Sequence, residues 1–181
     1  MDTINSNKID MINNLLNLKD DQINKLCELI MKVSKKNRIY CVGNGGSASI
    51  SNHFVCDLVK GMNDKKKFKM VSLSNNIEII TAISNDIEYE KIFSFQISKY
   101  AEKNDLLIAI SSSGKSKNII NAIKEAKKKL MTVVSLTGFN GGAALKLSDL
   151  NININSNNYG VIEDMHSFIM HSICQKLHNE Y

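Results

Sequence analysis

The sequence contains no proline among its 181 residues, and it shows no internal repeat and no linker of biased composition. Nothing therefore marks a boundary between domains, and a single domain over residues 1–181 is the simplest expectation. A chain of this length can bury a hydrophobic core without disulfides or a structural metal. No apolar run approaches the roughly 18 residues that a membrane-spanning helix needs, so we expect no membrane partner.

The cysteines are few and show no pairing pattern. Cys27, Cys41, Cys56 and Cys174 lie far apart and form no CxxC pair, so neither a zinc ribbon nor a disulfide framework is indicated. Most of them lie in apolar stretches, and we expect core thiols. The first ten residues also lack the basic and apolar segments of a secretory signal, which favours a cytoplasmic location.

The formal net charge is +5, and it comes largely from two short runs, DKKKFK at 64–69 and KEAKKK at 124–129. We interpret these runs as a solvated loop and the exposed face of a helix. The chain has no basic helix with interleaved aromatic residues and no nucleic-acid-binding motif, so we expect no nucleic-acid partner. A positive field of this kind would favour small anionic substrates.

Hydrophobic periodicity predicts an α/β fold. Residues 5–35 carry apolar positions at three- and four-residue spacing, which predicts two helices, and Asp20 and Asp21 could cap the second. Short apolar runs then predict strands at 38–42, 69–73, 105–110, 132–136 and 150–154. Helical patterns lie at 47–60, 77–84, 89–102, 116–129, 141–147 and 160–178. Such alternation predicts a parallel sheet, whose ligands bind beyond the carboxyl ends of the strands.

The loop after the third predicted strand, SSSGKSKN at 111–118, has the composition of an anion site. It places four hydroxyls, those of Ser111, Ser112, Ser113 and Ser116, at the start of a helix. Serine hydroxyls and helix N-terminal N–H groups donate to phosphate oxygens, and the helix dipole favours negative charge. A capping serine in an ordinary turn would explain one of these hydroxyls but not four.

The loop after the first predicted strand, GNGGSA at 43–48, matches the GxGxxA pattern of dinucleotide-binding proteins. A dinucleotide site needs an acidic residue about 20 positions further on to hold the ribose. The corresponding stretch here, SLSNN at 72–76, has no carboxylate. The chain also lacks GxxxxGK[ST], so neither nucleotide site is indicated.

Two predicted helices each carry a histidine and a carboxylate in register. His53 and Asp57 lie one turn apart on the flank of an apolar stripe, where we expect them to be partly buried. Glu163 and His171 share one face of the last helix with Ser167 and Cys174. Singly, such a histidine is often only a core residue. Together, the four residues could form an N/O site for zinc or a similar divalent ion.

With these motifs the chain resembles the phosphoheptose isomerase family of sugar isomerase (SIS) domains, which convert sedoheptulose 7-phosphate into glycero-manno-heptose 7-phosphate. The resemblance spans most of the chain, through GNGGSA, AISND at 82–86, SSSGKS at 111–116, SLTG at 135–138 and EDMHSFIMH at 163–171. It implies a three-layer, flavodoxin-like α/β sandwich with a five-stranded parallel sheet, preceded by two N-terminal helices. It also implies a homotetramer, with the helices of residues 1–36 packed between subunits and residues 37–181 forming the core.

The resemblance also implies roles for individual residues, including one zinc ion per subunit. Substrate contacts are implied for Asn44, Gly45, Gly46, Ser47, Asp57, Asn85, Asp86 and Glu163, with the phosphate held by Ser111, Ser112, Ser113 and Ser116. The implied metal ligands are His53, Asp57, Glu163 and His171. Asp57 and His171 are the candidate acid and base.

Two positions depart from the pattern of the best-known family members, because Asp57 replaces a glutamate and Glu163 replaces a glutamine. Aspartate reaches about 1.5 Å less far. Glu163 adds a negative charge, which should tighten a divalent cation and make it a weaker Lewis acid. A related sugar phosphate is therefore an alternative substrate. A second alternative is a non-catalytic SIS module that binds a phosphosugar or a partner protein, as relatives that associate with the replication initiator do. The presence of both histidines and both carboxylates favours the enzyme.

Overall fold

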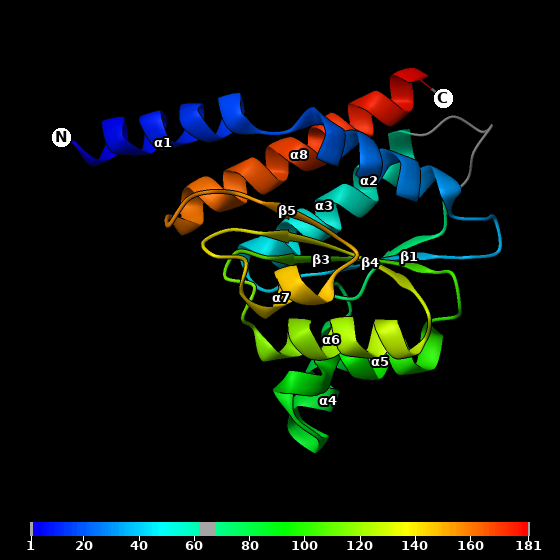
Figure 1. The fold of residues 1–181 in the computed structure, drawn as a ribbon. Helices are drawn as coiled ribbons and strands as arrows, with labels where there is room; N and C mark the ends of the chain where they lie inside the picture. Colours follow the sequence, from blue (N-terminus) through cyan, green and yellow to red (C-terminus); the bar gives the residue numbers. More distant parts are fainter. Residues whose placement is uncertain (1, 62–67, 181) are drawn as a thin grey trace.

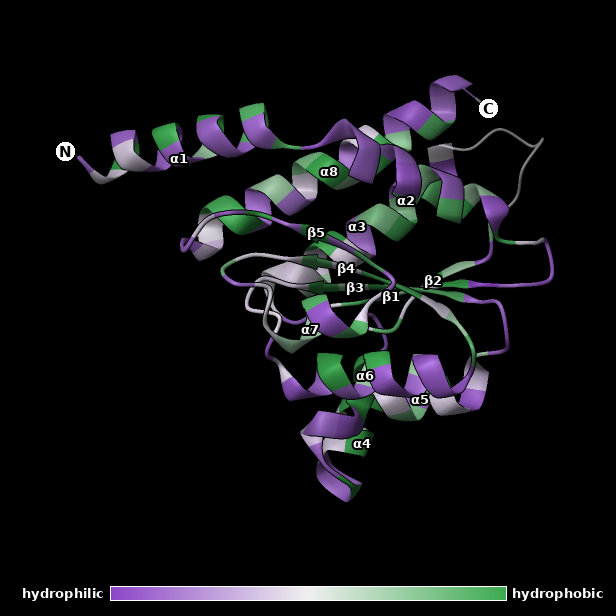
Figure 2. Ribbon diagram, viewed as in Figure 1, coloured by the Kyte–Doolittle hydropathy of each residue, from purple (hydrophilic) through white to green (hydrophobic). Residues whose placement is uncertain are grey.

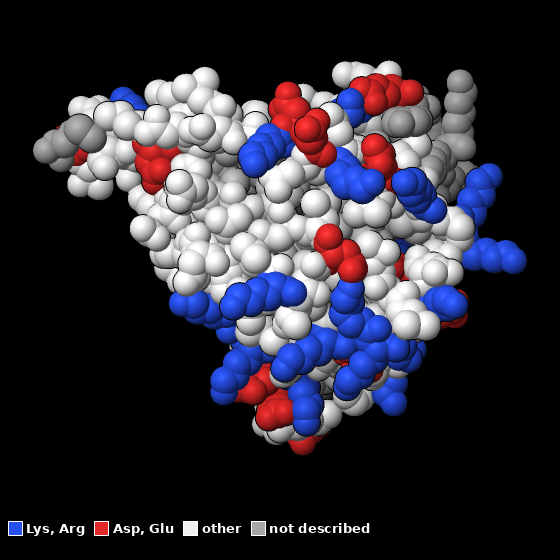
Figure 3. Space-filling view, viewed as in Figure 1, with Lys and Arg blue, Asp and Glu red and all other residues white. Residues whose placement is uncertain are grey.

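The computed structural model describes residues 2–61 and 68–180 of the chain. The first lysine-rich run, at 64–69, was predicted to be a solvated loop. Its residues 64–67 lie outside the described part of the chain. The second lysine-rich run is on α6 (Lys117–Lys128), where Lys124, Lys127 and Lys128 are exposed as predicted. Figure 3 shows basic side chains gathered over the region of this helix.

Five parallel strands form one sheet, in the order β2-β1-β3-β4-β5. Their bounds are β1 Ile39–Val42, β2 Met70–Ser72, β3 Leu106–Ser111, β4 Thr132–Thr137 and β5 Leu150–Asn153. The predicted α/β sandwich with a parallel sheet is confirmed. This strand order is that of flavodoxin-like folds, in which the order of the strands reverses between β1 and β3 and ligands bind at that switch point.

Helices cover both faces of the sheet, which makes three layers (Figure 1). One layer holds α1 (Thr3–Asn17), α2 (Asp20–Lys32), α3 (Gly46–Gly61) and α8 (Tyr159–Glu180). The other holds α4 (Ile77–Asp86), the 3-10 turn η1 (Tyr89–Lys91), α5 (Ile92–Tyr100), α6 and α7 (Gly142–Leu147). No helix of the described residues is long and apolar enough to cross a bilayer.

The strands are buried on both faces, as continuous apolar runs in a parallel sheet require. In β1, Ile39 and Cys41 join the core beneath α2, α3 and α8, while Tyr40 and Val42 join the core beneath α5 and α6. Figure 2 shows the hydrophobic strands in the middle layer, between the two layers of helices. Each such buried aliphatic side chain stabilises the fold by roughly 1.5–3 kcal/mol.

Helix α8 presents two different faces, and this division positions the site. Its fully buried face, which includes Ile162, Met165, Ile169 and Ile173, packs into the core. Glu163, Ser167, His171 and Cys174 are half-buried on the adjacent face, as their spacing predicted. Because α8 packs against α3, this second face borders the helix that carries His53 and Asp57.

Two local predictions need correction. Cys56 is exposed, whereas Cys27 and Cys41 are buried, because position 56 lies on the outer side of α3, off the Phe54 and Leu58 stripe. Asp20 and Asp21 do not cap α2. They lie inside its first turn, where their charges favour the positive end of the helix dipole.

Candidate functional site

A polar pocket of about 150 Å³ lies at the carboxyl ends of β1 and β3, at the switch point of the sheet. Most of its walls are hydroxyl and amide side chains. It is lined by Asn44, Ser47, Ile110, Ser111, Ser112, Ser113, Ser116, Tyr159 and Glu163. The structure therefore brings the serine loop, the glycine-rich loop and one carboxylate of the last helix to a single place.

The serine loop offers hydroxyls that the protein itself does not use. The Oγ atom of Ser112 is buried and has no hydrogen-bond partner among the described residues. Ser116 is the N-cap residue of α6, yet its side chain makes no capping hydrogen bond. A serine that served only as a cap would bond the first turn of its helix. These free hydroxyls, at the positive end of a helix dipole, fit an oxyanion such as phosphate.

Among the described residues, no lysine or arginine lines this pocket. Lys117 follows Ser116 directly, but its Nζ atom lies 2.7 Å from Oε1 of Glu90. That hydrogen bond and the charge of Glu90 raise the pKa of Lys117 and hold the ammonium in its charged form. The pocket therefore relies on neutral donors, which leave the negative charge of Glu163 uncompensated at its wall.

The glycine-rich loop needs glycine at two positions. Gly45 has φ +53°, in the left-handed region that side chains with a Cβ seldom adopt. Gly46 begins α3, and a β-carbon there would lie 2.2 Å from Oε2 of Glu163. The carboxylate of Glu163 therefore lies against the N-terminus of α3.

Three polar residues at or beside the pocket were not among the predicted site residues. Tyr159 lines the pocket. Asn118 exchanges two hydrogen bonds of 2.9 Å with the side chain of Asn44, and the Tyr89 hydroxyl donates to Asn44 at 3.0 Å. Asn118 ends the SSSGKSKN stretch, which was the only signal for it. No local pattern in the sequence marked the two tyrosines.

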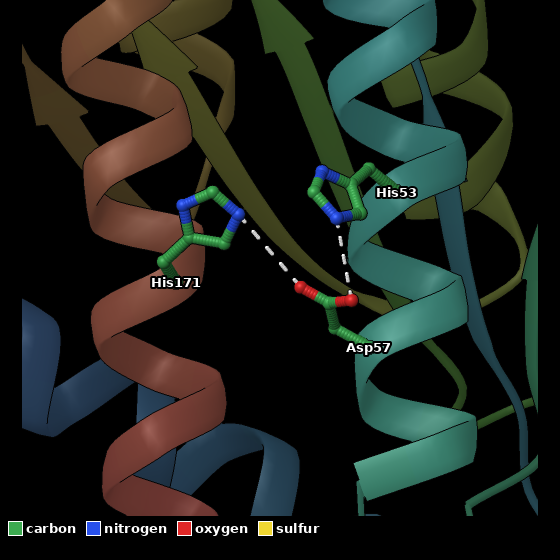
Figure 4. Close-up of side chains that lie close together, drawn as sticks. All are labelled: His53, Asp57 and His171. Atoms are coloured by element: carbon green, nitrogen blue, oxygen red, sulfur yellow. Dashed lines mark ion pairs between the residues drawn. The ribbon is translucent and has the colours of Figure 1, made fainter.

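A second cluster lies between α3 and α8, where His53, Asp57 and His171 point toward one another (Figure 4). The Nε2 atom of His53 lies 3.3 Å from Oδ1 of Asp57, and Nε2 of His171 lies 3.8 Å from Oδ2. The imidazole rings meet edge to face, with centroids 5.0 Å apart. One ligand atom from each of the three residues lies within 4.8 Å of the other two. We name this set the His-Asp-His cluster.

The cluster is more open than predicted. The side chain of His53 is 57% exposed, that of His171 45% and that of Asp57 30%. The expectation that His53 is partly buried is wrong for the single chain, because His53 lies at the outer edge of the α3–α8 contact. Asp57 is the member that both helices enclose.

The donor set fits a divalent metal ion. Each imidazole Nε2 lies within 4 Å of a different oxygen of Asp57, and one ligand atom from each of the three residues lies within 4.8 Å of the others, so small side-chain movements would bring all three to about 2.1 Å from one zinc ion. Two imidazoles and one carboxylate with a remaining open position are the ligands of catalytic rather than structural zinc sites.

The structure does not bring Glu163 into this cluster. Glu163 precedes His171 by eight residues in α8, which separates them by about 12 Å along the helix axis. Its carboxylate reaches instead into the polar pocket. Its predicted role as a metal ligand therefore has no support in the geometry of the single chain.

Cys174 lies one turn beyond His171, beside the cluster. Burial raises the pKa of its thiol to about 12, and the charges of Asp57 and of Cys27 add to this shift. Cys174 is therefore protonated at neutral pH. It lines a pocket of about 380 Å³ that begins at Asp57 and His171 and extends to His178.

Asn85 and Asp86 lie away from both sites. They are exposed at the end of α4, where the Asn85 amide donates to Asp86 at 2.9 Å. Asp86 lines a largely apolar groove between α4 and α5. Their predicted contact with substrate stays a prediction.

Comparison with known proteins places these features in context. Residues 5–138 match the family model of the SIS domain. A probable phosphoheptose isomerase of Thermoplasma acidophilum is 34% identical over 168 residues, 92% of both chains, and the phosphoheptose isomerase of Aliarcobacter butzleri is 39% identical over 145 residues, 80% of this chain and 77% of its own. The solved phosphoheptose isomerase of Francisella tularensis superposes with a TM-score of 0.89 at 26% identity, covering 98% of this chain and 95% of its own.

Proposed function

We propose, since this chain belongs to the phosphoheptose isomerases of the SIS domain family, that it converts sedoheptulose 7-phosphate into D-glycero-D-manno-heptose 7-phosphate. The family membership makes it an enzyme that isomerises sugar phosphates. One structural observation carries the choice of a seven-carbon substrate. It is the spacing between the polar pocket and the His-Asp-His cluster.

Helix α8 supplies a measure of that spacing, because Glu163 lies in the pocket and His171 in the cluster, about 12 Å further along the axis. In an extended chain each bond advances about 1.2 Å, so the eight bonds from C1 to phosphorus in a heptose 7-phosphate span about 10 Å. The six bonds of a pentose 5-phosphate span only about 7 Å. This comparison supports a seven-carbon sugar, with phosphate among the serines and C1 and C2 beside His171.

The isomerisation moves one hydrogen between neighbouring carbons. A proton leaves C1 of the ketose, an enediolate forms, and a proton is added to C2 while another passes between the two oxygens. Asp57 and His171 are the proposed acid and base, and His171 is favoured because imidazole suits proton transfer near neutral pH. Since a nitrogen bound to metal cannot accept a proton, either the two carboxylate oxygens of Asp57 divide the two roles or His171 is released from the metal during turnover. The two oxygens of Asp57 face different imidazoles, so one can remain a ligand while the other orients His171.

The His-Asp-His cluster would hold the metal, which we propose to be one Zn²⁺ per subunit. When bound, such an ion polarises the carbonyl and hydroxyl oxygens of the sugar and stabilises the negative charge that develops on them. Glu163 is placed to accept hydrogen bonds from sugar hydroxyls at the pocket end of the substrate. The serine loop binds the remote phosphate, whose binding energy positions the reacting carbons.

We also propose that the chain assembles as a homotetramer through residues 1–36, with residues 37–181 as the catalytic core. The apolar side chains that α1 leaves exposed support this, because Ile4, Ile12 and Leu16 are 62%, 54% and 79% exposed. Such residues on one helix are typical of an interface. A cytoplasmic location stays a prediction.

The test measures zinc content and turnover together. Purified protein is expected to contain about one zinc per chain and to convert sedoheptulose 7-phosphate, with the product identified by NMR. His171→Ala should lose both properties, whereas His178→Ala should keep both, because His178 is exposed and lies outside the cluster. Turnover of five-carbon but not seven-carbon ketose phosphates would contradict the proposed substrate. Unchanged turnover in His171→Ala would contradict the proposed mechanism.

A further inference from the structure

Hydrogen bonds hold the side-chain amide of Asn44 in one orientation, and one of its two N–H hydrogens remains without an acceptor in the described part of the chain. Its Oδ1 atom accepts two hydrogen bonds, from Nδ2 of Asn118 at 2.9 Å and from the hydroxyl of Tyr89 at 3.0 Å, which use both lone pairs. Its Nδ2 atom donates one hydrogen to Oδ1 of Asn118 at 2.9 Å. The second hydrogen of Nδ2 has no acceptor among the described residues. Asn44 lines the polar pocket, so this N–H is available to a ligand there.

A backbone N–H group of α6 fixes the orientation of the Asn118 amide, and Asn118 in turn orients Asn44. The N–H of Ile119 donates to Oδ1 of Asn118 at 2.9 Å, so the Asn118 amide cannot be reversed without setting two donors against each other. Asn118 is 2% exposed, which leaves it little freedom. Because Asn118 is fixed, its two hydrogen bonds favour one orientation of Asn44, and the bond from the Tyr89 hydroxyl to Oδ1 adds a third that holds the same orientation. The Tyr89 hydroxyl must then act as the donor toward Asn44.

Tyr89 is in turn held against α6. It begins the short turn η1, in which the next residue, Glu90, pairs with Lys117 at 2.7 Å and accepts a hydrogen bond from Asn121 through its carbonyl at 3.0 Å. The same helix begins directly after the serine loop. The turn therefore connects the two loops that form the pocket, although the Tyr89 side chain is 54% exposed and does not line it.

We propose that Tyr89 and Asn118 are positioning residues for the phosphate of the substrate. They saturate the acceptor of the Asn44 amide and so present its remaining N–H to a phosphate oxygen held by the serine loop. An amide free to rotate would present its carbonyl oxygen part of the time, and that oxygen would repel the phosphate. This inference rests on the proposed function only in taking a sugar phosphate as the ligand.

The test compares Tyr89→Phe with Tyr100→Phe, a matched control whose side chain is 47% exposed and whose hydroxyl makes no hydrogen bond to the described residues. Tyr89→Phe should raise KM for sedoheptulose 7-phosphate about three- to tenfold and weaken binding of inorganic phosphate by a similar factor, with kcat within about twofold. Asn118→Asp should raise KM further, because its second carboxylate oxygen faces Oδ1 of Asn44. Tyr100→Phe should match the wild type.

A double-mutant cycle separates positioning from a general structural role. In an Asn44→Ala background, Tyr89→Phe should change neither KM nor phosphate binding further, since it acts through Asn44. An equal effect in both backgrounds overturns the inference, as does a fall in kcat and melting temperature with KM and phosphate binding unchanged. Wild-type protein that binds phosphate in a Tyr89-dependent way without isomerising the sugar would overturn the proposed function alone. If the wild type isomerises the sugar and Tyr89→Phe shows the same KM and phosphate binding as Tyr100→Phe, this inference alone is overturned.

Discussion

The carboxylate of Glu163 lies so close to the backbone of Gly46 that a β-carbon at position 46 would be 2.2 Å from its Oε2 atom, well inside contact distance. This contact joins the N-terminal part of α8, which carries Glu163, to the N-terminus of α3. Glu163 therefore lies at the polar pocket and not in the His-Asp-His cluster.

Replacing Gly46 by alanine should therefore displace Glu163. The contact is with the end of a flexible side chain, so the protein can adapt at a cost within about 1 kcal/mol. The carboxylate would leave the pocket, however, and kcat/KM should fall about tenfold, as expected for a lost hydrogen bond to a charged group. Thermal denaturation and steady-state kinetics measure the two effects.

Two comparisons make this prediction specific. Gly61→Ala, at the other end of α3, should be neutral because an added β-carbon meets nothing within 4 Å. Glu163→Ala should show the same loss of kcat/KM as Gly46→Ala, and the double variant should lose no more. Wild-type kinetics for Gly46→Ala alongside impaired Glu163→Ala would show that the displacement does not occur.

Ser112→Ala should have opposite effects on stability and binding. The Ser112 hydroxyl is buried without a partner, so its removal should stabilise the ligand-free protein by about 1 kcal/mol. The same hydroxyl is expected to donate to phosphate, so inorganic phosphate should stabilise the variant less than the wild type. Calorimetric melting with and without phosphate measures both effects.

Ser135→Ala is the matched control, because Ser135 is equally buried but its hydroxyl accepts a 2.7 Å hydrogen bond from Asn151. Its removal should destabilise the protein and leave the response to phosphate unchanged. A Ser112→Ala protein that is less stable and responds normally to phosphate would exclude Ser112 from the anion site.

The fold could be predicted because its signals are local. Apolar runs such as the one in β3, and three- and four-residue spacing in α8, report burial directly, and every predicted strand and helix is present. One expected helix, at 89–102, is divided into η1 and α5. Periodicity over three residues does not distinguish a 3-10 turn from the start of an α-helix.

The site was predictable only in part, because it joins segments that are distant in the chain. The spacing of His53 and Asp57 placed them one turn apart, but only the packing of α3 against α8 brings His171 to them. The sequence placed Glu163 and His171 on one helix face and grouped them in one site, but it could not show that the Glu163 carboxylate enters the polar pocket instead. The hydrogen bonds of Asn44 to Tyr89 and Asn118 depend on tertiary structure and had no sequence signal.

Assembly should depend on the exposed apolar face of α1. Leu16, at 79% exposure, is expected to be buried between subunits in the proposed tetramer. Leu16→Glu should therefore lower the mass measured by light scattering from four chains of 20.2 kDa to a smaller species. Leu130→Glu should leave the mass unchanged. It replaces a leucine that is 62% exposed and lies just after α6. A wild-type monomer would contradict the proposal, and equal dissociation in both variants would remove α1 from the interface.

Acid should destabilise the protein through His166, a fully buried histidine of α8 that does not belong to either site. Burial lowers the pKa of its imidazole to about 4, although a 3.1 Å hydrogen bond to the Thr137 carbonyl opposes this shift. In the unfolded chain a histidine titrates near pH 6.5. Between these values the unfolded state binds the proton and the folded state does not. Stability should therefore fall as the pH decreases from about 6.5 to 4, by up to about 3 kcal/mol from this residue.

His166→Gln removes the titrating group while keeping a side-chain N–H for the Thr137 carbonyl. The stability difference between wild type and His166→Gln, measured by urea denaturation with a chelator present to exclude metal effects, should change by up to about 3 kcal/mol in favour of the variant between pH 7 and pH 4. A difference for His166→Gln that stays constant with pH would mean that His166 is accessible to protons in the folded state.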